Sequence, residues 1–188
     1  MTTARQLDPM TFPLHGTRLI EASAGTGKTY TIAGLYLRLV LGHGGPNGFA
    51  RPLTPPEILV VTFTNAATEE LRDRIRCRLA RAAAFFRGQA SGDDDLVALR
   101  RSYTVDQWPG RAHLLDQAAQ WMDQAAIHTI HGWCQRILRQ HAFDSNSLFD
   151  LELAPDEQDL LEAAACDYWR CQLYPLPADQ LIALTALT

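Results

Sequence analysis

The segment Leu19–Leu39 constrains the fold of this chain more than any other stretch. The apolar pair Leu19-Ile20 precedes a run of small residues at 22–27, and Lys28 and Thr29 follow directly. Apolar residues then recur at helical spacing as far as Leu39. This order predicts a short strand, a tight loop and an amphipathic helix that begins near Lys28.

The predicted loop has the chemistry of a phosphate-binding site. Gly25 and Gly27 lack a Cβ atom, so the backbone can take left-handed turns and bring its N–H groups close to a polyphosphate. The helix that follows directs its positive dipole end at the same anion. In such loops a lysine reaches the β- and γ-phosphates and a hydroxyl ligates Mg²⁺, which assigns these roles to Lys28 and Thr29. The sequence therefore predicts ATP and Mg²⁺ as cofactors, Thr29 as the metal ligand, and a nucleotide-binding set of Ala22, Ser23, Ala24, Gly25, Thr26, Gly27, Lys28 and Thr29.

The use of lysine supports this interpretation. Lys28 is the only lysine in the chain, and every other residue of the Lys/Arg class is arginine. A phosphate-binding loop needs a compact ammonium on a flexible stem, which a planar guanidinium does not replace. The loop begins with Ala22 where the strict motif has glycine, and the alternative is a glycine-rich turn between strand and helix that binds no ligand.

Length and charge limit the other function classes. The 188 residues, 47% of them hydrophobic, suffice for one domain or slightly more with a sizeable core. A formal net charge of −4 excludes a generally basic nucleic-acid coat, so nucleic-acid binding requires a local patch. No apolar run approaches the roughly 20 residues that span a bilayer, and no apolar signal core begins the chain, which predicts a cytoplasmic protein without a membrane partner. Four cysteines without C-x-x-C spacing are expected to be buried free thiols, with a metal site or disulfide as the alternative: Cys77, Cys134, Cys166 and Cys171.

Strands alternate with helices along the chain. Three apolar runs, 18–21, 58–63 and 126–130, are predicted to be strands. The run 58–63 is continuous and rich in β-branched residues, which is typical of a central parallel strand covered on both faces. Helices are expected after each strand, at 96–101 and 111–124 on either side of a turn at 108–110, and from 157 onward, while 148–153 favours an extended conformation. The pattern predicts an α/β fold with a parallel sheet flanked by helices.

Two of the expected helices have clear apolar faces. The first is expected to bury Ile32, Leu35, Tyr36, Leu39 and Val40. The second is expected to begin at a Thr64-Asn65 cap and to bury Leu71, Ile75 and Leu79. This second helix also carries five arginines, which form either a nucleic-acid-binding patch or a solvated helix face: Arg72, Arg74, Arg76, Arg78 and Arg81.

Polar and aromatic side chains follow the second and third predicted strands. Ligands sit at the carboxyl ends of strands in open α/β sheets, and hydroxyl, amide and aromatic groups there can grip a sugar-phosphate backbone and stack a base. The alternatives are core packing for Phe63 and Trp133, and a helix cap or a buried core histidine for His131. The candidate DNA-binding residues are Thr62, Phe63, Thr64, Asn65, Thr129, His131 and Trp133.

Together, these motifs resemble those of the UvrD-like superfamily 1 helicases. Residues 22–29 resemble motif I, residues 61–72 resemble motif Ia, and residues 129–134 resemble the T-x-H-G-F motif with tryptophan in place of phenylalanine. Flanking segments at 19–23, 126–136 and 167–176 resemble the N-terminal region of the helicase–nuclease subunits of exodeoxyribonuclease V.

The resemblance implies a P-loop NTPase of the RecA-like type that moves on single-stranded DNA in the 3′-to-5′ direction. It implies double-stranded DNA and two further subunits as partners, and a nuclease activity in the complete protein. We expect residues 1–145 to form part of the first RecA-like domain, with a helical excursion at about 82–124, and residues 146–188 to begin a helical insertion.

Such an ATPase also needs an acidic pair after an apolar strand, to hold Mg²⁺ and activate water. Asp156-Glu157 follows a proline and precedes a helical pattern, so we interpret it as a helix start. The chain is therefore expected to be an N-terminal piece without turnover of its own. The alternatives are a stand-alone DNA- or partner-binding module, a piece of another UvrD-like helicase, and an unrelated P-loop kinase or ATPase.

Overall fold

The computed structural model describes residues 7–23, 25, 27–145, 157–178 and 180. The chain divides into two compact units, Met1–Arg136 and Ile137–Thr188. The first unit contains the helices α1 (Lys28–Leu41), α2 (Asn65–Phe86), α3 (Asp94–Arg101) and α4 (Trp108–Gln120), the strands β1 (Val60–Thr62) and β2 (Ile127–Thr129), and the start of α5 (Ile130–Gln140). Short 3-10 helices lie at Gly45–Asn47, Pro55–Glu57, Val105–Gln107 and Trp121–Gln124. The second unit contains the rest of α5, α6 (Ala142–Ser145), α7 (Gln158–Tyr168) and a π-helical turn at Trp169–Leu173.

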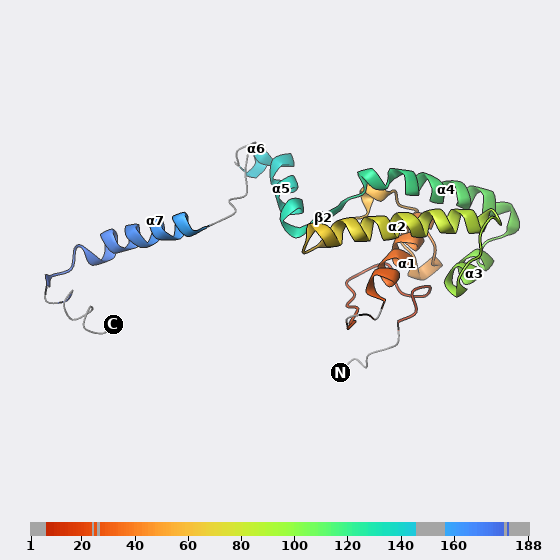
Figure 1. The fold of residues 1–188 in the computed structure, drawn as a ribbon, viewed down its shortest axis with the longest axis horizontal. Coiled ribbons are helices and arrows are strands. Elements are labelled where there is room, and N and C mark those ends of the chain that lie inside the picture. The colour runs from red at the N-terminus through yellow and green to blue at the C-terminus, as the bar shows by residue number, and fades with distance from the viewer. Residues whose placement is uncertain (1–6, 24, 26, 146–156, 179, 181–188) are drawn as a thin grey trace. The chain divides into compact units, whose positions relative to one another are not determined.

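The core of the first unit lies between helices. In Figure 1, α2 and α4 run side by side, and α1 packs against both. The predicted apolar face of α2 is confirmed, because Leu71 is 7% exposed and Ile75 and Leu79 are fully buried. The core is completed by other fully buried side chains, among them Leu96, Leu99, Leu115, Met122 and Ile127.

The sheet is small and parallel. Strand β1 pairs with β2, with Val60 opposite Ile127 and Thr62 opposite Thr129. Both predicted strands therefore exist, each shorter than expected. The expectation that residues 58–63 are covered on both faces is wrong: α2 covers one face, whereas Val61 on the other face is 48% exposed. A side chain in a strand points to one face only, so every second residue of this run stays open to solvent.

The predicted strand at 18–21 is not formed. The backbone of residues 17–23 has no regular secondary structure, and Leu19 is 82% exposed. A strand exists only through hydrogen bonds to a neighbouring strand, and the sheet of the described residues contains β1 and β2 alone. The loop that leads into α1 is thus preceded by a segment without regular secondary structure.

Three smaller expectations also change. Residues 108–110 begin α4 instead of forming a turn, because the first turn of a helix tolerates Pro109, which has no N–H to donate. On α1, Ile32 is exposed while Tyr36 and Val40 are buried as predicted. All four cysteines are free, but they are exposed and not buried.

Some features of the sequence lie outside the part of the chain that the structure describes. The possible extended segment 148–153 is one of them, as are Ala24 and Thr26 of the predicted loop. Among the described residues, no helix combines the length and apolar character needed to cross a membrane.

Candidate nucleotide site and strand-end surface

The N-terminus of α1 is open toward solvent. Gly27 caps the helix with φ 84° and offers no side chain to the first-turn N–H groups, and no acidic residue lies in that turn. Thr31 N–H donates to the Gly27 carbonyl at 2.9 Å, so the N–H groups of Lys28, Thr29 and Tyr30 precede the helical ladder. Gly25 has φ 77°, also in the left-handed region that the sequence predicted. These features suit an anion.

The Lys28 ammonium lies over the loop that precedes it. It donates hydrogen bonds to the carbonyls of Ser23, at 2.8 Å, and Ala22, at 3.2 Å, and the side chain is exposed. Two neutral carbonyls are weaker partners for an ammonium than a charged phosphate oxygen, because charge-assisted hydrogen bonds are about twice as strong as neutral ones. The amine is therefore held in place but can exchange its partners for an anion.

A hollow of about 650 Å³ lies beside this amine. That volume is within the range of small-molecule sites. Its walls combine apolar and charged groups and come from the segment before the loop and from α1 itself: Leu7, Arg18, Ile20, Glu21, Ala22, Ser23, Lys28, Thr31 and Ile32. The residues present thus fit a nucleotide whose phosphates face the helix N-terminus. Thr29 is half-buried and is the second residue of α1.

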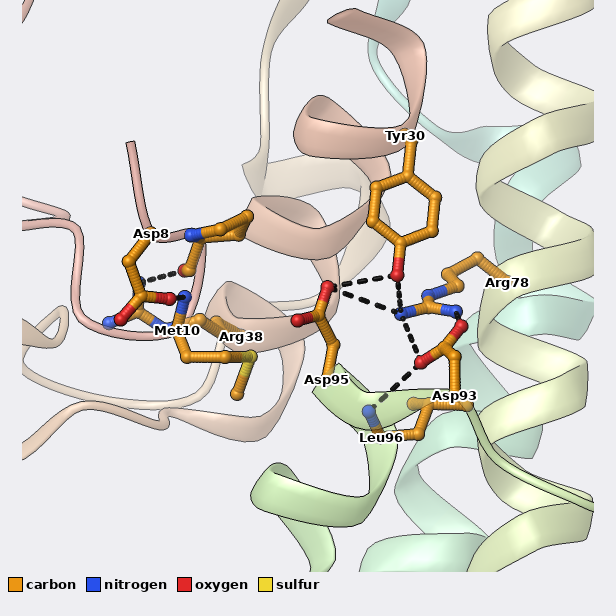
Figure 2. A network of polar contacts seen from close by, with 9 residues as sticks. Asp8, Met10, Tyr30, Arg38, Arg78, Asp93, Asp95 and Leu96 are labelled. Carbon is orange, nitrogen blue, oxygen red and sulfur yellow. Dashed lines mark hydrogen bonds and ion pairs between the residues drawn. The ribbon is translucent and has the colours of Figure 1, made fainter. Parts of the chain in front are cut away.

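A polar cluster connects the first turn of α1 to two other helices (Figure 2). The Tyr30 hydroxyl donates to Asp95 at 2.9 Å and accepts from Arg78 at 3.2 Å. Arg78, from α2, forms a bidentate ion pair with Asp93. Its guanidinium also stacks over the Tyr30 ring, with the guanidinium carbon 4.8 Å from the ring centroid. Asp93 also caps α3 by accepting the Leu96 N–H at 3.0 Å. We call Tyr30, Arg78, Asp93 and Asp95 the Tyr30 cluster.

Burial and charge act in opposite directions in the Tyr30 cluster. Burial raises the pKa of Tyr30 to about 12, assisted by its hydrogen bond to Asp95. For Asp93, burial alone would raise the pKa, but the hydrogen bonds from Arg78 and the Leu96 N–H outweigh it, so the pKa is lowered. Near pH 7 Tyr30 is therefore neutral and Asp93 is ionised, and the cluster holds the residue next to Thr29.

Sequence reasoning missed the Tyr30 cluster. A signal for Asp93 exists, since an acidic residue three positions before the apolar Leu96 is typical of a helix cap. The other end of α1 is also held by a residue that the sequence did not single out. Arg38 is fully buried and donates to the carbonyls of Pro9 and Phe12, both at 2.7 Å.

The ends of the two strands lie side by side. The register places Thr62 opposite Thr129, so the residues that follow β1 and β2 start from one edge of the sheet. The hydroxyls have structural roles there: Thr64 Oγ1 caps α2 by accepting the Ala67 N–H, and Thr129 Oγ1 accepts the Gly132 N–H at 3.1 Å. The predicted cap is thereby confirmed for Thr64, whereas Asn65 is the first residue of α2.

The aromatic candidates have different surroundings. Phe63 is 86% exposed, which removes core packing as its explanation. Trp133 is half-buried, and its ring stacks on His128, with centroids 5.9 Å apart and planes 22° apart. His131 is exposed, so it is not a buried core histidine.

Three of the five arginines of α2 have partners within the fold. Arg72 donates to the Ile127 carbonyl at 3.0 Å, Arg76 pairs with Asp123 at 2.5 Å, and Arg78 belongs to the Tyr30 cluster. Arg74 is exposed and forms a pair with Glu70 at 3.6 Å. Arg81 is also exposed, so the structure engages three of these charges within the fold and leaves Arg74 and Arg81 at the surface.

Comparison with known proteins places these features in a family. The model of the UvrD/REP helicase N-terminal domain matches residues 2–181. The chain is 49% identical over 176 residues to the RecBCD enzyme subunit RecB of Escherichia coli (strain K12), covering 94% of this chain and 15% of that protein. It is 50% identical over 178 residues to the same subunit of Haemophilus influenzae, covering 90% and 14%. The subunit of Mycobacterium tuberculosis (strain ATCC 25618 / H37Rv) is 34% identical over 146 residues. The matched region thus makes up 14–15% of the length of the first two relatives.

Proposed function

Because the chain belongs to the UvrD/REP helicase N-terminal domain family, we propose that it forms the ATP-binding part of a RecB-type DNA helicase. The observation that carries the proposal is the exposed Lys28 ammonium at the open N-terminus of α1, beside a hollow of nucleotide size. Family membership favours this function over a stand-alone binding module, and the engaged arginines of α2 give that alternative no support.

In the complete protein, ATP held at this site together with Mg²⁺ would supply the phosphoanhydride bond whose cleavage drives movement on DNA. Lys28 exchanges its carbonyl partners for phosphate oxygens, and the first-turn N–H groups of α1 donate to the same anion. The Thr29 hydroxyl holds the metal ion. The remaining loop residues, 22–27, bring their backbone N–H groups to the phosphates.

The strand ends form the proposed track for single-stranded DNA. Phe63 and Trp133 stack bases, while the other candidates contact the sugar-phosphate backbone: Thr62, Thr64, Asn65, Thr129 and His131. The hydroxyl oxygens of Thr64 and Thr129 already accept hydrogen bonds from backbone N–H groups. Their O–H groups can still donate hydrogen bonds to phosphate oxygens.

For the complete protein, we infer a 3′-to-5′ helicase and exonuclease subunit that acts on double-stranded DNA ends in recombinational repair. RecC- and RecD-like subunits are its proposed partners, and the cytoplasm its proposed location. In this proposal residues 1–145 belong to the first RecA-like domain, with a helical excursion at about 82–124, and residues 146–188 begin a helical insertion. The printed sequence has no apolar run that leads directly into Asp-Glu, so we propose that these residues bind ATP without hydrolysing it.

Two assays on the full chain test this proposal. Phosphate release is measured with and without single-stranded DNA, and DNA-stimulated turnover would contradict the proposed lack of hydrolysis. Affinity for an oligothymidylate is measured against salt concentration, and Phe63→Ala is expected to weaken binding by about 1–3 kcal/mol, the value of one stacked base. Phe49→Ala is the matched control, because Phe49 is also exposed, at 42%, and is not one of the proposed track residues. Equal affinities for the two variants would remove the proposed DNA track.

A further inference from the structure

The proposed function assigns no role to His128. It lies in the middle of β2, opposite Val61, while its neighbour Ile127 is fully buried. Since successive side chains of a strand point to opposite faces, His128 lies on the sheet face that α2 leaves open. Strand β2 ends one residue later, at Thr129, and α5 begins directly after it.

The His128 ring stacks on the indole of Trp133. The two rings are nearly parallel, at 22°, with centroids 5.9 Å apart, which is within the range of offset-stacked aromatic pairs. Its Nε2 atom is buried and has no hydrogen-bond partner in the described part of the chain. The ring is therefore held by stacking and not by a hydrogen bond through Nε2.

The electrostatic surroundings keep this ring uncharged. Burial lowers the pKa of His128, and the positive charges of Arg136 and Arg72 lower it further. A neutral imidazole presents an aromatic face to the indole without adding a cation to the surface. Trp133 in turn is only half-buried, so one ring contact supports it and part of its surface remains accessible.

We propose that His128 is a positioning residue that holds the Trp133 indole in place for stacking against a base of single-stranded DNA. This inference rests on the proposed function, because it needs DNA to cross the strand ends. Trp133 sits on the first turn of α5, four residues beyond the end of β2, where a free indole would sample several rotamers. Stacking on His128 removes that freedom before DNA arrives, and preorganisation of this kind increases affinity by reducing the ordering cost of binding.

Variants of the full chain test the proposal through affinity for an oligothymidylate and the quenching of tryptophan emission. His128→Ala is expected to weaken binding about two- to tenfold, the equivalent of one aromatic pair. His128→Phe, which keeps an aromatic face, is expected to retain wild-type affinity. Trp133→Leu is expected to weaken binding at least as much and to remove the DNA-dependent quenching, whereas Trp121→Leu, at a tryptophan that is 44% exposed elsewhere, changes neither.

The outcomes separate this inference from the proposed function. Absence of DNA binding by the wild-type chain would overturn both. Wild-type binding that Trp133→Leu weakens and His128→Ala leaves unchanged would overturn the role of His128 alone. Failure of His128→Phe to restore affinity, with unfolding temperatures equal to wild type, would also overturn it, because the aromatic face would then not be the active feature.

Discussion

Replacement of one charge in the Tyr30 cluster gives a quantitative test of how α1 is held. Asp93→Asn keeps a side-chain oxygen that can cap α3, because asparagine is as good an N-cap as aspartate, and it removes only the negative charge. Arg78→Met removes the positive charge and keeps an apolar stem of similar length. The side chains differ in burial: Arg78 is 7% exposed, whereas Asp93 is 29% and Asp95 27% exposed.

This difference predicts unequal losses of stability. Asp93→Asn leaves a buried guanidinium with Asp95 at 3.9 Å as its remaining anion. Removing one partner of a buried pair costs about 3–5 kcal/mol, and the remaining anion and partial exposure of Asp93 reduce this to about 2–3 kcal/mol. Arg78→Met leaves two partly hydrated carboxylates, at a cost of about 1–2 kcal/mol. The double variant is expected to lose less than the sum of the two, because the residues contact each other.

Urea unfolding of the full chain, followed by far-ultraviolet circular dichroism at pH 7, measures these losses. Arg74→Met is the matched control: its pair with Glu70 is exposed on both sides, and its loss is expected to stay within about 0.5 kcal/mol. A larger loss for Arg78→Met than for Asp93→Asn, or strict additivity in the double variant, would refute the reasoning from burial.

Three further perturbations follow from the same packing. The pKa of Asp93 is lowered in the folded state, so its contribution to stability is present above its ordinary pKa of about 3.9 and is lost as the pH falls through the folded value. The free energy of unfolding of Asp93→Asn, measured by urea unfolding, is therefore expected to decrease less than that of the wild type over this acid range. Gly42→Ala is expected to lower stability by at least about 1 kcal/mol, because Gly42 ends α1 with φ 61° and an added Cβ would lie 2.9 Å from Pro52; thermal unfolding measures it. Leu115→Ala is expected to cost about 2–5 kcal/mol in urea unfolding, and Leu19→Ala, at an exposed residue, less than about 0.5 kcal/mol.

The features that the sequence predicted well depend on neighbours along the chain. The α1 start at Lys28, the Thr64 cap and the buried face of α2 follow from residues within one or two helical turns. Parallel pairing of the two later strands also agrees with their apolar patterns. The family match supports the same interpretation of the motifs.

The features that the sequence did not predict depend on contacts between distant residues. Leu19 and Ile20 have the composition of a strand, yet no strand pairs with them in the described residues. Arg78 belongs to a run of arginines with the appearance of a solvated face, and only the approach of α1 and α3 buries it.

Titration calorimetry with MgATP, comparing the wild-type chain with Lys28→Ala and Lys28→Arg, tests the central claim most directly. Lys28→Ala is expected to weaken binding roughly 10- to 100-fold, because a hydrogen bond to a charged group contributes about 1.5–3 kcal/mol. Lys28→Arg is expected to recover only part of this, since a planar guanidinium does not reproduce the contacts of the ammonium. Wild-type affinity in Lys28→Ala would contradict the assignment of α1 as the phosphate-binding helix.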